Sequence, residues 1–170
     1  MSQNKQDKGF RYSIRKCSIG VCGVAIATFL LGSGLIFQSN VVKATEPSVA
    51  AVTGENIAVH KPASQSSIAY GGDASRAVDG NHDNAWSHRS VTHTDFQDHS
   101  WWKVDLEKEE SVGTVRIYNR GDGDVANRLS NFDVILLDKA GNEVTRQHID
   151  SLNNQPTVDV QFSGVNARYV

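Results

Sequence analysis

Cysteine is scarce in this chain, with two among 170 residues. Both of them, Cys17 and Cys22, lie in an N-terminal segment that has the layout of an export signal. Removal of that segment leaves a chain without cysteine, which excludes disulfide bonds and metal sites built on thiolates. The rest of the sequence also lacks an internal repeat and lacks any helical pattern of three turns. These absences exclude a repeat protein and a helical domain.

Residues 1–44 show the three parts of a signal peptide. A basic start precedes an apolar run from Ile19 to Phe37, and Val42-Lys43-Ala44 offers small residues for a signal peptidase. Tyr12-Ser13-Ile14-Arg15-Lys16 resembles the signal motif of Gram-positive surface proteins, so we expect a secreted or cell-surface product. The apolar run is long enough for the alternative of a retained membrane helix, which its glycines and the polar segment after it disfavour.

Charge separates the two parts of the chain. The whole chain has a formal net charge of −2, from 17 Lys and Arg against 19 Asp and Glu. Six of the basic residues and one of the acidic ones lie in residues 1–44, so the remainder has 11 minus 18, or −7. An acidic domain lacks the basic surface of a nucleic-acid binder, and that class of function is excluded.

Short apolar–polar alternations follow a linker at residues 45–54 and predict strands. A turn at Asp138-Lys139-Ala140-Gly141-Asn142 predicts a hairpin between two of them. Strands at this spacing, with Gly, Asn and Asp turns, indicate an all-β jelly-roll β-sandwich over residues 55–170. The expected strands are Trp102–Leu106, Val115–Ile117, Phe132–Leu136, Glu143–His148, Val158–Phe162 and one that begins at Ala167–Val170. Because that last strand stops at once, we expect a domain that is incomplete at its C-terminus.

A set of hydrogen-bond donors lies in the turns between these strands. His93, Arg120 and Arg128 supply an imidazole and two forked guanidiniums, which suit the vicinal hydroxyls of a sugar. Asp122, between the two arginines, is expected to orient them. Tyr70 is the candidate apolar wall of the same site. No side chain is placed as a nucleophile with its base, so the pattern indicates binding without catalysis.

The chain resembles the F-type lectin (fucolectin) family, a branch of the discoidin-like, galactose-binding-domain-like folds. The resemblance covers about residues 55–170 and is carried by Asn56-Ile57-Ala58, Lys61 to Ser67, Ala77 to Asn81, Trp86, Thr92-His93-Thr94, Trp101 to Leu106, Asn119-Arg120 and Arg128 to Phe132. It implies that His93, Arg120, Asp122 and Arg128 form an L-fucose site. It also implies partners among fucosylated glycans of the blood-group or Lewis type, with the membrane reached only through the signal peptide or a downstream domain.

The same resemblance implies a Ca²⁺ site. Its ligands are expected from the carbonyl of Arg76, the carboxylate of Asp79, the carbonyl of Asn81, and Ser90. Oxygen ligands on a kinked acidic loop suit calcium, although Asp-Gly-Asn is also common in turns that bind no ion. One departure from the family is that many members have two adjacent cysteines after Arg-x-Asp. This chain has Gly123 to Asn127 there, with Val125 and Ala126 as the apolar residues.

Several alternatives remain at this stage. Arg120 and Arg128 are also suited to plain surface ion pairs with Asp122 and Asp124. The spacing of His82, His88, His93 and His99 invites a zinc site but fits no zinc motif. Arg120-Gly121-Asp122 spells an integrin-binding tripeptide. At the level of the domain, the alternatives are a targeting module of a glycoside hydrolase and a discoidin-like domain for another ligand. Trp86, Trp101 and Trp102 are each expected in the core.

Overall fold

The structure, a computed structural model, describes residues 17–21, 54–123 and 125–170. These residues form six strands and three short 3-10 helices: β1 (Cys17–Val21), β2 (Ala63–Gln65), η1 (Ala74–Val78), η2 (Trp86–His88), β3 (Trp102–Tyr118), η3 (Ala126–Arg128), β4 (Ser130–Leu137), β5 (Glu143–Ser151) and β6 (Thr157–Tyr169). The all-β prediction is confirmed. Among the described residues, no helix has the length and apolar character needed to span a membrane.

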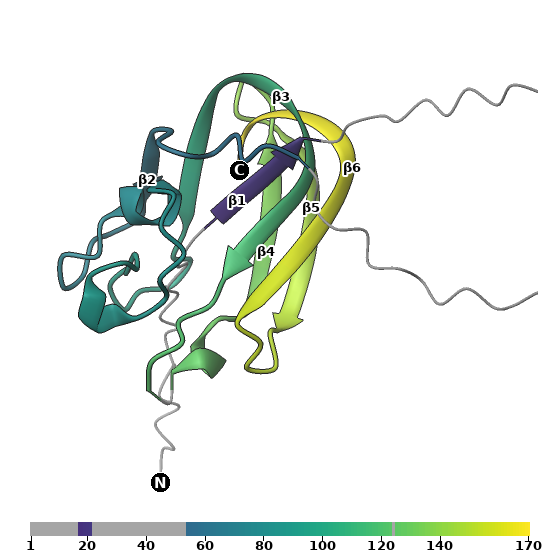
Figure 1. Ribbon diagram of the computed structural model, residues 1–170. Coiled ribbons are helices and arrows are strands. Elements are labelled where there is room, and N and C mark those ends of the chain that lie inside the picture. Colours follow the sequence, from purple (N-terminus) through teal and green to yellow (C-terminus); the bar gives the residue numbers. More distant parts are fainter. Residues whose placement is uncertain (1–16, 22–53, 124) are drawn as a thin grey trace, which may run out of the picture.

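The strands pair in the order β1-β3-β6-β4-β5, with β2 on a separate part of β3. The pairs are antiparallel, and β6 meets β4 only where Leu137 pairs with Tyr169. Figure 1 shows β3 and β6 curving over the top of the domain. The sheet therefore bends back on itself and encloses the core. This is the sandwich that the alternating pattern predicts. The hairpin is also as predicted, because Asp138 N donates to the Asn142 carbonyl at 2.9 Å.

Two pairs of expected strands are single long strands. β3 joins Trp102–Leu106 to Val115–Ile117, and its register against β6 shifts between Asp105 and Glu110. β6 continues from Val158–Phe162 through Ala167 to Tyr169, so the prediction of a new strand beginning at Ala167 is wrong. Ser163 and Gly164 in the middle of β6 have φ of 54° and 79°. Irregular backbone of this kind bends a strand without ending it, whereas the same polar residues look like a break in the sequence.

The first strand lies inside the segment expected to be a signal peptide. Cys17–Val21 pairs with Val112–Ile117 of β3, on the edge that β6 does not occupy. An unpaired strand edge accepts an extended segment readily, which accounts for this pairing in the uncleaved chain. The other residues of 1–44, and the linker up to residue 53, lie outside the described residues, and so does Asp124.

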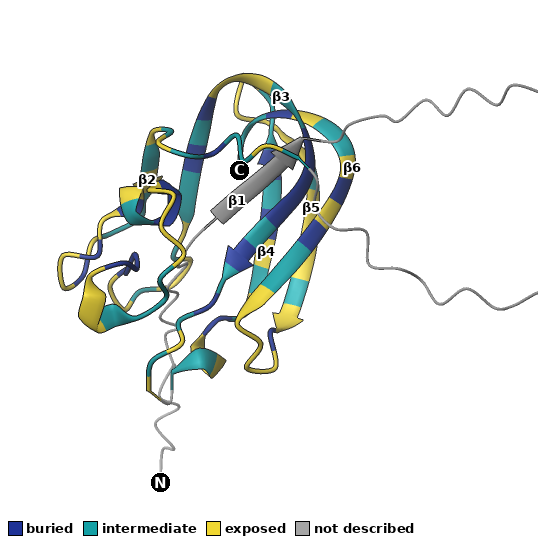
Figure 2. Cartoon of the chain, in the orientation of Figure 1, coloured by how far each residue is buried: buried dark blue, intermediate teal, exposed yellow. Residues whose placement is uncertain are grey.

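The core is formed by one face of each long strand (Figure 2, dark blue). Its residues include Val104, Leu106, Val112, Val115, Ile117, Leu129, Val134, Leu136, Val160 and Phe162. Trp102 packs against this core and donates from Nε1 to the Ala74 carbonyl at 2.9 Å, as expected. Trp101 is 48% exposed, so the expectation that it lies in the core is wrong. Neighbours on a strand point to opposite faces, and only one of two adjacent tryptophans reaches the interior.

A mainly apolar groove of about 830 Å³ lies between β3 and β4 and includes Val115, Ile117, Leu129, Phe132 and Val134 in its lining. It opens beside Val170, whose backbone N and O both bond to Val104 of β3. The residues predicted to bind sugar lie elsewhere, in loops that join β2 to β3 and β3 to β4.

Candidate functional site

The site is built on the loop that follows β3. Asn119 is buried, its side-chain N donates to the Ala126 carbonyl at 2.8 Å, and its side-chain O accepts the Arg120 amide at 2.9 Å. A buried amide that uses both of its ends fixes the backbone around it. The start of the loop is therefore rigid, and the segment that leads to Arg128 is tied to the base of Arg120.

Arg120 and Asp122 form a two-point ion pair. Nε lies 2.5 Å from Oδ1 and Nη2 lies 3.1 Å from Oδ2 of the carboxylate. The Arg120 guanidinium, by hydrogen bonding, holds the pKa of Asp122 below its usual range. The guanidinium also lies over the ring of Trp86, 5.5 Å from its centroid. A planar cation fixed on one side by a carboxylate and on one face by an indole presents its remaining N–H groups in one direction. The expectation that Asp122 orients Arg120 fits this geometry.

The loop that precedes β3 supplies the imidazole. His93 is 6% exposed, and its Nδ1 lies 2.7 Å from the Thr94 carbonyl. A carbonyl only accepts hydrogen bonds, so Nδ1 carries a proton in this contact. The contact with Thr94 holds the imidazole in one orientation.

Aromatic rings surround the imidazole. The Tyr70 ring stands at 90° to it with centroids 5.3 Å apart, and the Trp86 ring lies 5.4 Å away at 65°. Tyr70 is 73% exposed, as suits a wall that a ligand contacts. His93, Arg120, Asp122 and Tyr70 are thus brought together as predicted, with Trp86 between them.

Trp86 is a site residue that sequence reasoning missed. It was expected in the core, but it is only half-buried and contacts Tyr70, His93 and Arg120. A signal was present, because Trp86 stands in a polar stretch with no strand alternation on either side. Arg128 is exposed in η3, and its role in the site stays a prediction.

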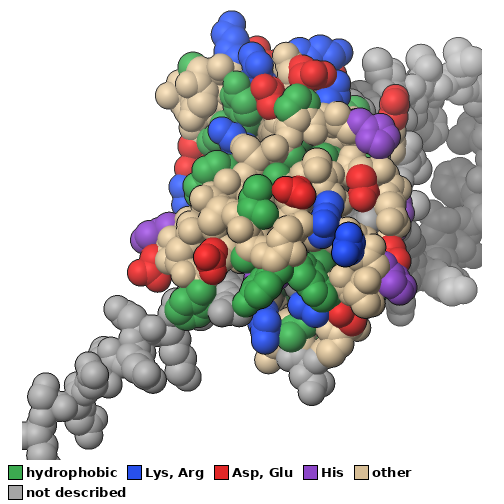
Figure 3. Space-filling view, turned by 90° about the vertical axis from the view of Figure 1, so that its left-hand side faces the viewer, with side chains coloured by type: hydrophobic (Ala, Val, Ile, Leu, Met, Phe, Trp, Pro, Cys, Tyr) green, Lys and Arg blue, Asp and Glu red, His purple; other side chains and the backbone are tan. Residues whose placement is uncertain are grey.

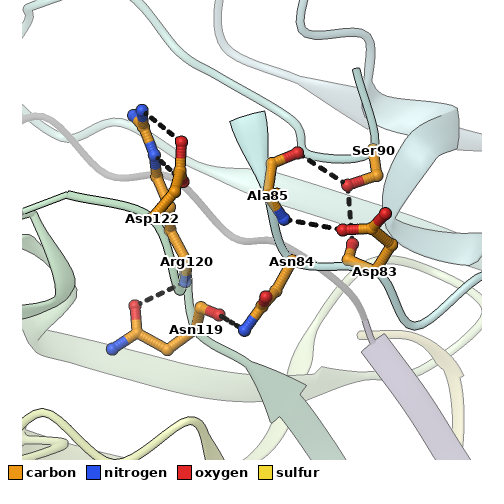
Figure 4. A network of polar contacts seen from close by, with 7 residues as sticks. All are labelled: Asp83, Asn84, Ala85, Ser90, Asn119, Arg120 and Asp122. Carbon is orange, nitrogen blue, oxygen red and sulfur yellow. Dashed lines mark hydrogen bonds and ion pairs between the residues drawn. The ribbon is translucent and has the colours of Figure 1, made fainter. Parts of the chain in front are cut away.

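Figure 4 shows how the two loops are joined. The Asn84 side chain donates to the Asn119 carbonyl at 3.1 Å, and Gly121 N donates to the Asn84 carbonyl at 3.1 Å. A Cβ at position 121 would come within 2.6 Å of the Asn84 amide atoms, so any larger residue there would displace the side chain that bonds to Asn119. The loop around Trp86, between β2 and β3 (the Trp86 loop), is therefore bonded directly to the loop around Arg120, between β3 and β4 (the Arg120 loop).

Two of the residues expected to bind calcium, Asp79 and Asn81, lie in successive turns in which the side chain accepts from the amide two residues on. Asp79 accepts from Asn81 at 2.8 Å, and Asn81 accepts from Asp83 at 2.9 Å. Ser90 Oγ, which is buried, lies 2.6 Å from the Asp83 carbonyl and 3.0 Å from that of Ala85. Arg76 is the last basic residue of η1, and its guanidinium reaches the Val91 carbonyl at 3.4 Å. The set is rich in oxygen and fits a calcium ion in its chemistry.

The rival interpretations receive no support from the described part of the chain. No cluster of three or more His, Cys, Asp or Glu residues suited to a metal occurs there, and His82 stacks on Tyr118 at 4.7 Å instead. His88 pairs with Asp83. In Arg120-Gly121-Asp122 the two charged side chains bind each other, so the tripeptide is not displayed as an integrin ligand. The pairing of Arg128 with Asp124 lies outside the described residues.

Figure 3 shows the face of the domain on the side of these loops. Hydrophobic and basic side chains adjoin on its lower part, a combination suited to a polar ligand with an apolar edge. Fold and site together define a carbohydrate-binding β-sandwich module.

Comparison with known proteins gives the family. A family described as NedA-like, galactose-binding domain (F5/F8 type C) matches residues 76–170, so the chain belongs to that family. The YSIRK type signal peptide matches residues 7–32, and the chain is exported to the cell surface or beyond.

Solved structures support the narrower resemblance. The lectin domain of lectinolysin, complexed with Lewis B antigen, is 63% identical, with 68% of this chain and 82% of that chain covered and a TM-score of 0.67. A Streptococcus pneumoniae fucose binding module is 50% identical over 66% of this chain and 79% of that one, with a TM-score of 0.64. These relatives are lectins and carbohydrate-binding modules, and the domain is a binding module with no enzymatic role.

The curated relatives match over a shorter length. Fucolectin-5 of Anguilla japonica is 44% identical over 75 residues, which is 41% of this chain and 40% of that protein. The chain thus spans about two fifths of the length of the curated relatives that it matches.

The Arg120–Asp122 pair predicts a pH dependence of stability. The folded-state pKa of Asp122 is lowered, so its stabilising effect is present above the pKa of the unfolded carboxyl and is lost as the pH falls through the lowered value. We expect Asp122→Asn to lower the free energy of unfolding by about 1 kcal/mol at pH 7, a small amount because solvent screens the partly exposed pair. The difference should be smaller at pH 3, which lies below the usual pKa of an unfolded carboxyl. Urea unfolding at both pH values measures this. An equal difference at the two pH values would mean that the ion pair contributes nothing.

Proposed function

We propose that this domain binds L-fucose at the ends of fucosylated glycans of the blood-group or Lewis type. Binding of this kind would direct a secreted or surface protein, such as a pore-forming toxin, to host cells. The observation that carries the proposal is the preformed contact of His93, Trp86 and Arg120, with Asp122 behind the arginine and Tyr70 beside the imidazole. The relatives whose titles name Lewis B antigen and fucose support it further.

The recognition follows from the groups present. Arg120 supplies forked N–H donors whose direction is fixed by Asp122, and Arg128 is the second guanidinium of the proposed set. His93, whose Nδ1 is held by the Thr94 carbonyl, would present Nε2 to a sugar hydroxyl, which can either donate or accept. The exposed Tyr70 ring and the edge of Trp86 give an apolar wall for the methyl group of a 6-deoxy sugar. A sugar without the matching hydroxyl would leave these charged donors unpaired, and that selects against it.

A glycan array tests this assignment. It should carry fucosylated blood-group and Lewis structures together with the same cores lacking fucose and with terminal galactose. We expect retention on the fucosylated glycans and signals at least about tenfold weaker on the others, which corresponds to about 1.4 kcal/mol. Equal or stronger signals on galactose or on the bare cores would contradict the proposal and favour a discoidin-like domain for another ligand.

We propose in addition that Arg76, Asp79, Asn81 and Ser90 hold a calcium ion that stabilises the Trp86 loop. Asn84 links this loop to the backbone that carries Arg120, so an ordered Asp79–Ser90 segment would keep the sugar site in place. Calcium supplies only a fixed positive charge for oxygen ligands there, and the sugar is recognised by the side chains already named.

Thermal unfolding tests the calcium proposal. Because the ion binds the folded state, 1 mM CaCl2 should raise the melting temperature above that measured in a chelator, and Asp79→Ala should remove the difference. Asp150→Ala, which removes an exposed carboxylate on β5, is the matched control and should keep it. Identical melting temperatures of the unsubstituted chain with calcium and with chelator would exclude the site.

A further inference from the structure

A side chain that does not face the ligand holds the two sides of the site together. Gln65 is the last residue of β2 and is half-buried. Its side-chain nitrogen lies within hydrogen-bond distance of three backbone carbonyls, those of Ser67 at 2.7 Å, Gly72 at 3.0 Å and His93 at 3.1 Å, and its two hydrogens are shared among them. Three carbonyls from two separate segments therefore converge on one nitrogen. Its Oε1 is buried and has no hydrogen-bond partner among the described residues, so the amide is oriented by its donor end alone.

Two of these three carbonyls, those of Gly72 and His93, also accept backbone hydrogen bonds, and we call this set of backbone bonds the clasp. Ala69 N donates to the His93 carbonyl and His93 N donates to the Gly72 carbonyl, each at 2.9 Å. Gly72 N in turn donates to the Ala69 carbonyl at 3.0 Å. The segment from Ala69 to Gly72 is thus folded around His93, and Gln65 adds side-chain hydrogen bonds to two of the same carbonyls, those of Gly72 and His93.

The conformation inside the clasp is one that the chain does not adopt freely. Tyr70 has a φ of 51° and Gly71 a φ of 66°, both in the left-handed region. A tyrosine is rarely found there unless surrounding contacts impose it. Since the Tyr70 side chain is 73% exposed, little packing holds its ring in place. The 5.3 Å contact between the rings of Tyr70 and His93 therefore depends on the backbone conformation of Ala69 to Gly72, which the hydrogen bonds of Gln65 help to hold.

We propose that Gln65 is a positioning residue of the sugar site, which fixes Tyr70 against His93 without touching the ligand. This inference rests on the proposed function, since it assigns Gln65 a part in fucose binding. Without the amide, the segment from Ala69 to Gly72 (the Tyr70 turn) becomes more mobile. Binding of the sugar must then restore its conformation, and the lost entropy lowers the affinity.

The test compares Gln65→Met, which keeps the length but has no donor, with Gln65→Asn, which keeps a donor on a shorter stem. Calorimetric titration with L-fucose should give dissociation constants that rise from the unsubstituted chain to Gln65→Asn to Gln65→Met, the last by about tenfold. Gln147→Met, at an exposed position on β5, is the matched control and should bind as the unsubstituted chain does. The milder Gln65→Asn keeps the test informative if Gln65→Met does not fold.

A double-mutant cycle separates positioning from general stability. If Gln65 acts through the Tyr70 turn, Gln65→Met should weaken binding clearly less in a Tyr70→Ala background than in the unsubstituted chain. A folded Gln65→Met protein with an unchanged dissociation constant, or effects that simply multiply, would overturn the proposal.

A measurement without sugar distinguishes this proposal from the proposed function. The nuclear Overhauser effect between the rings of Tyr70 and His93 should be present in the unsubstituted chain and lost or strongly reduced in Gln65→Met. If the unsubstituted chain fails to bind fucose, the proposed function is wrong, and this effect still decides whether Gln65 holds the two residues together. An equally strong effect in Gln65→Met would show that it does not.

Discussion

Replacement of Arg120 by alanine is expected to reduce affinity for L-fucose about 100-fold. The substitution removes charge-assisted hydrogen bonds, each contributing about 1.5–3 kcal/mol, and leaves Asp122 without its partner. It also removes the cation that lies over Trp86. A loss of about 3 kcal/mol corresponds to two orders of magnitude in the dissociation constant. Calorimetric titration with the free sugar measures it.

Two further variants make this result specific. Arg120→Lys keeps the charge but not the fork that binds Asp122 at two points, so we expect a loss of about tenfold. Arg146→Ala removes another arginine that is held by carboxylates, but on β5, and should leave the dissociation constant unchanged. Binding by Arg120→Ala as strong as that of Arg146→Ala would rule out the site.

Replacement of Gly72 by alanine is the second change with a large expected effect. A Cβ at this position would lie 2.6 Å from both the Cβ and the backbone N of His93. The backbone of His93 cannot move aside as the end of a flexible side chain can. The segment from Ala69 to Gly72 must therefore move away from His93 to make room for the added methyl group. We expect a loss of roughly 1–3 kcal/mol in the free energy of unfolding, as in other overpacked sites. Fucose binding should fall by at least about tenfold in the protein that remains folded.

Gly141→Ala is the matched control for Gly72→Ala. Gly141 lies in the turn between β4 and β5 at a φ of 83°, and an added Cβ there would meet only open space. An alanine at this position should cost about 1–2 kcal/mol of stability through backbone strain, yet leave fucose binding unchanged. If both variants lose binding in proportion to stability, the effect of Gly72 is on the fold and not on the site.

The strands could be predicted from the sequence because their signal is local. Alternation at Trp102, Val104 and Leu106 sets one face inward, and the structure packs those positions into or against the core. The continuity of β3 and β6 could not be predicted. It depends on pairing between the two strands through their irregular stretches, and Ser163-Gly164 looks like a break when it is seen alone.

The site likewise has features that could be predicted from the sequence and features that could not. The pairing of Arg120 with Asp122 could be predicted, because two residues in one short loop meet whatever the rest of the fold does. The position of Trp86 could not, since it depends on contacts of Asn84 with a loop that lies 35 residues further along the chain. Gln65 escaped notice for a related reason. Its importance comes from three carbonyls that the fold gathers around it, and a backbone carbonyl leaves no mark in a sequence.

The most direct test of the account is a crystal structure of this chain with L-fucose. The account predicts the sugar in contact with the Arg120 guanidinium and with Nε2 of His93, its methyl group against Tyr70 or Trp86. A sugar bound elsewhere, for example in the apolar groove between β3 and β4, with His93 and Arg120 untouched, would contradict it.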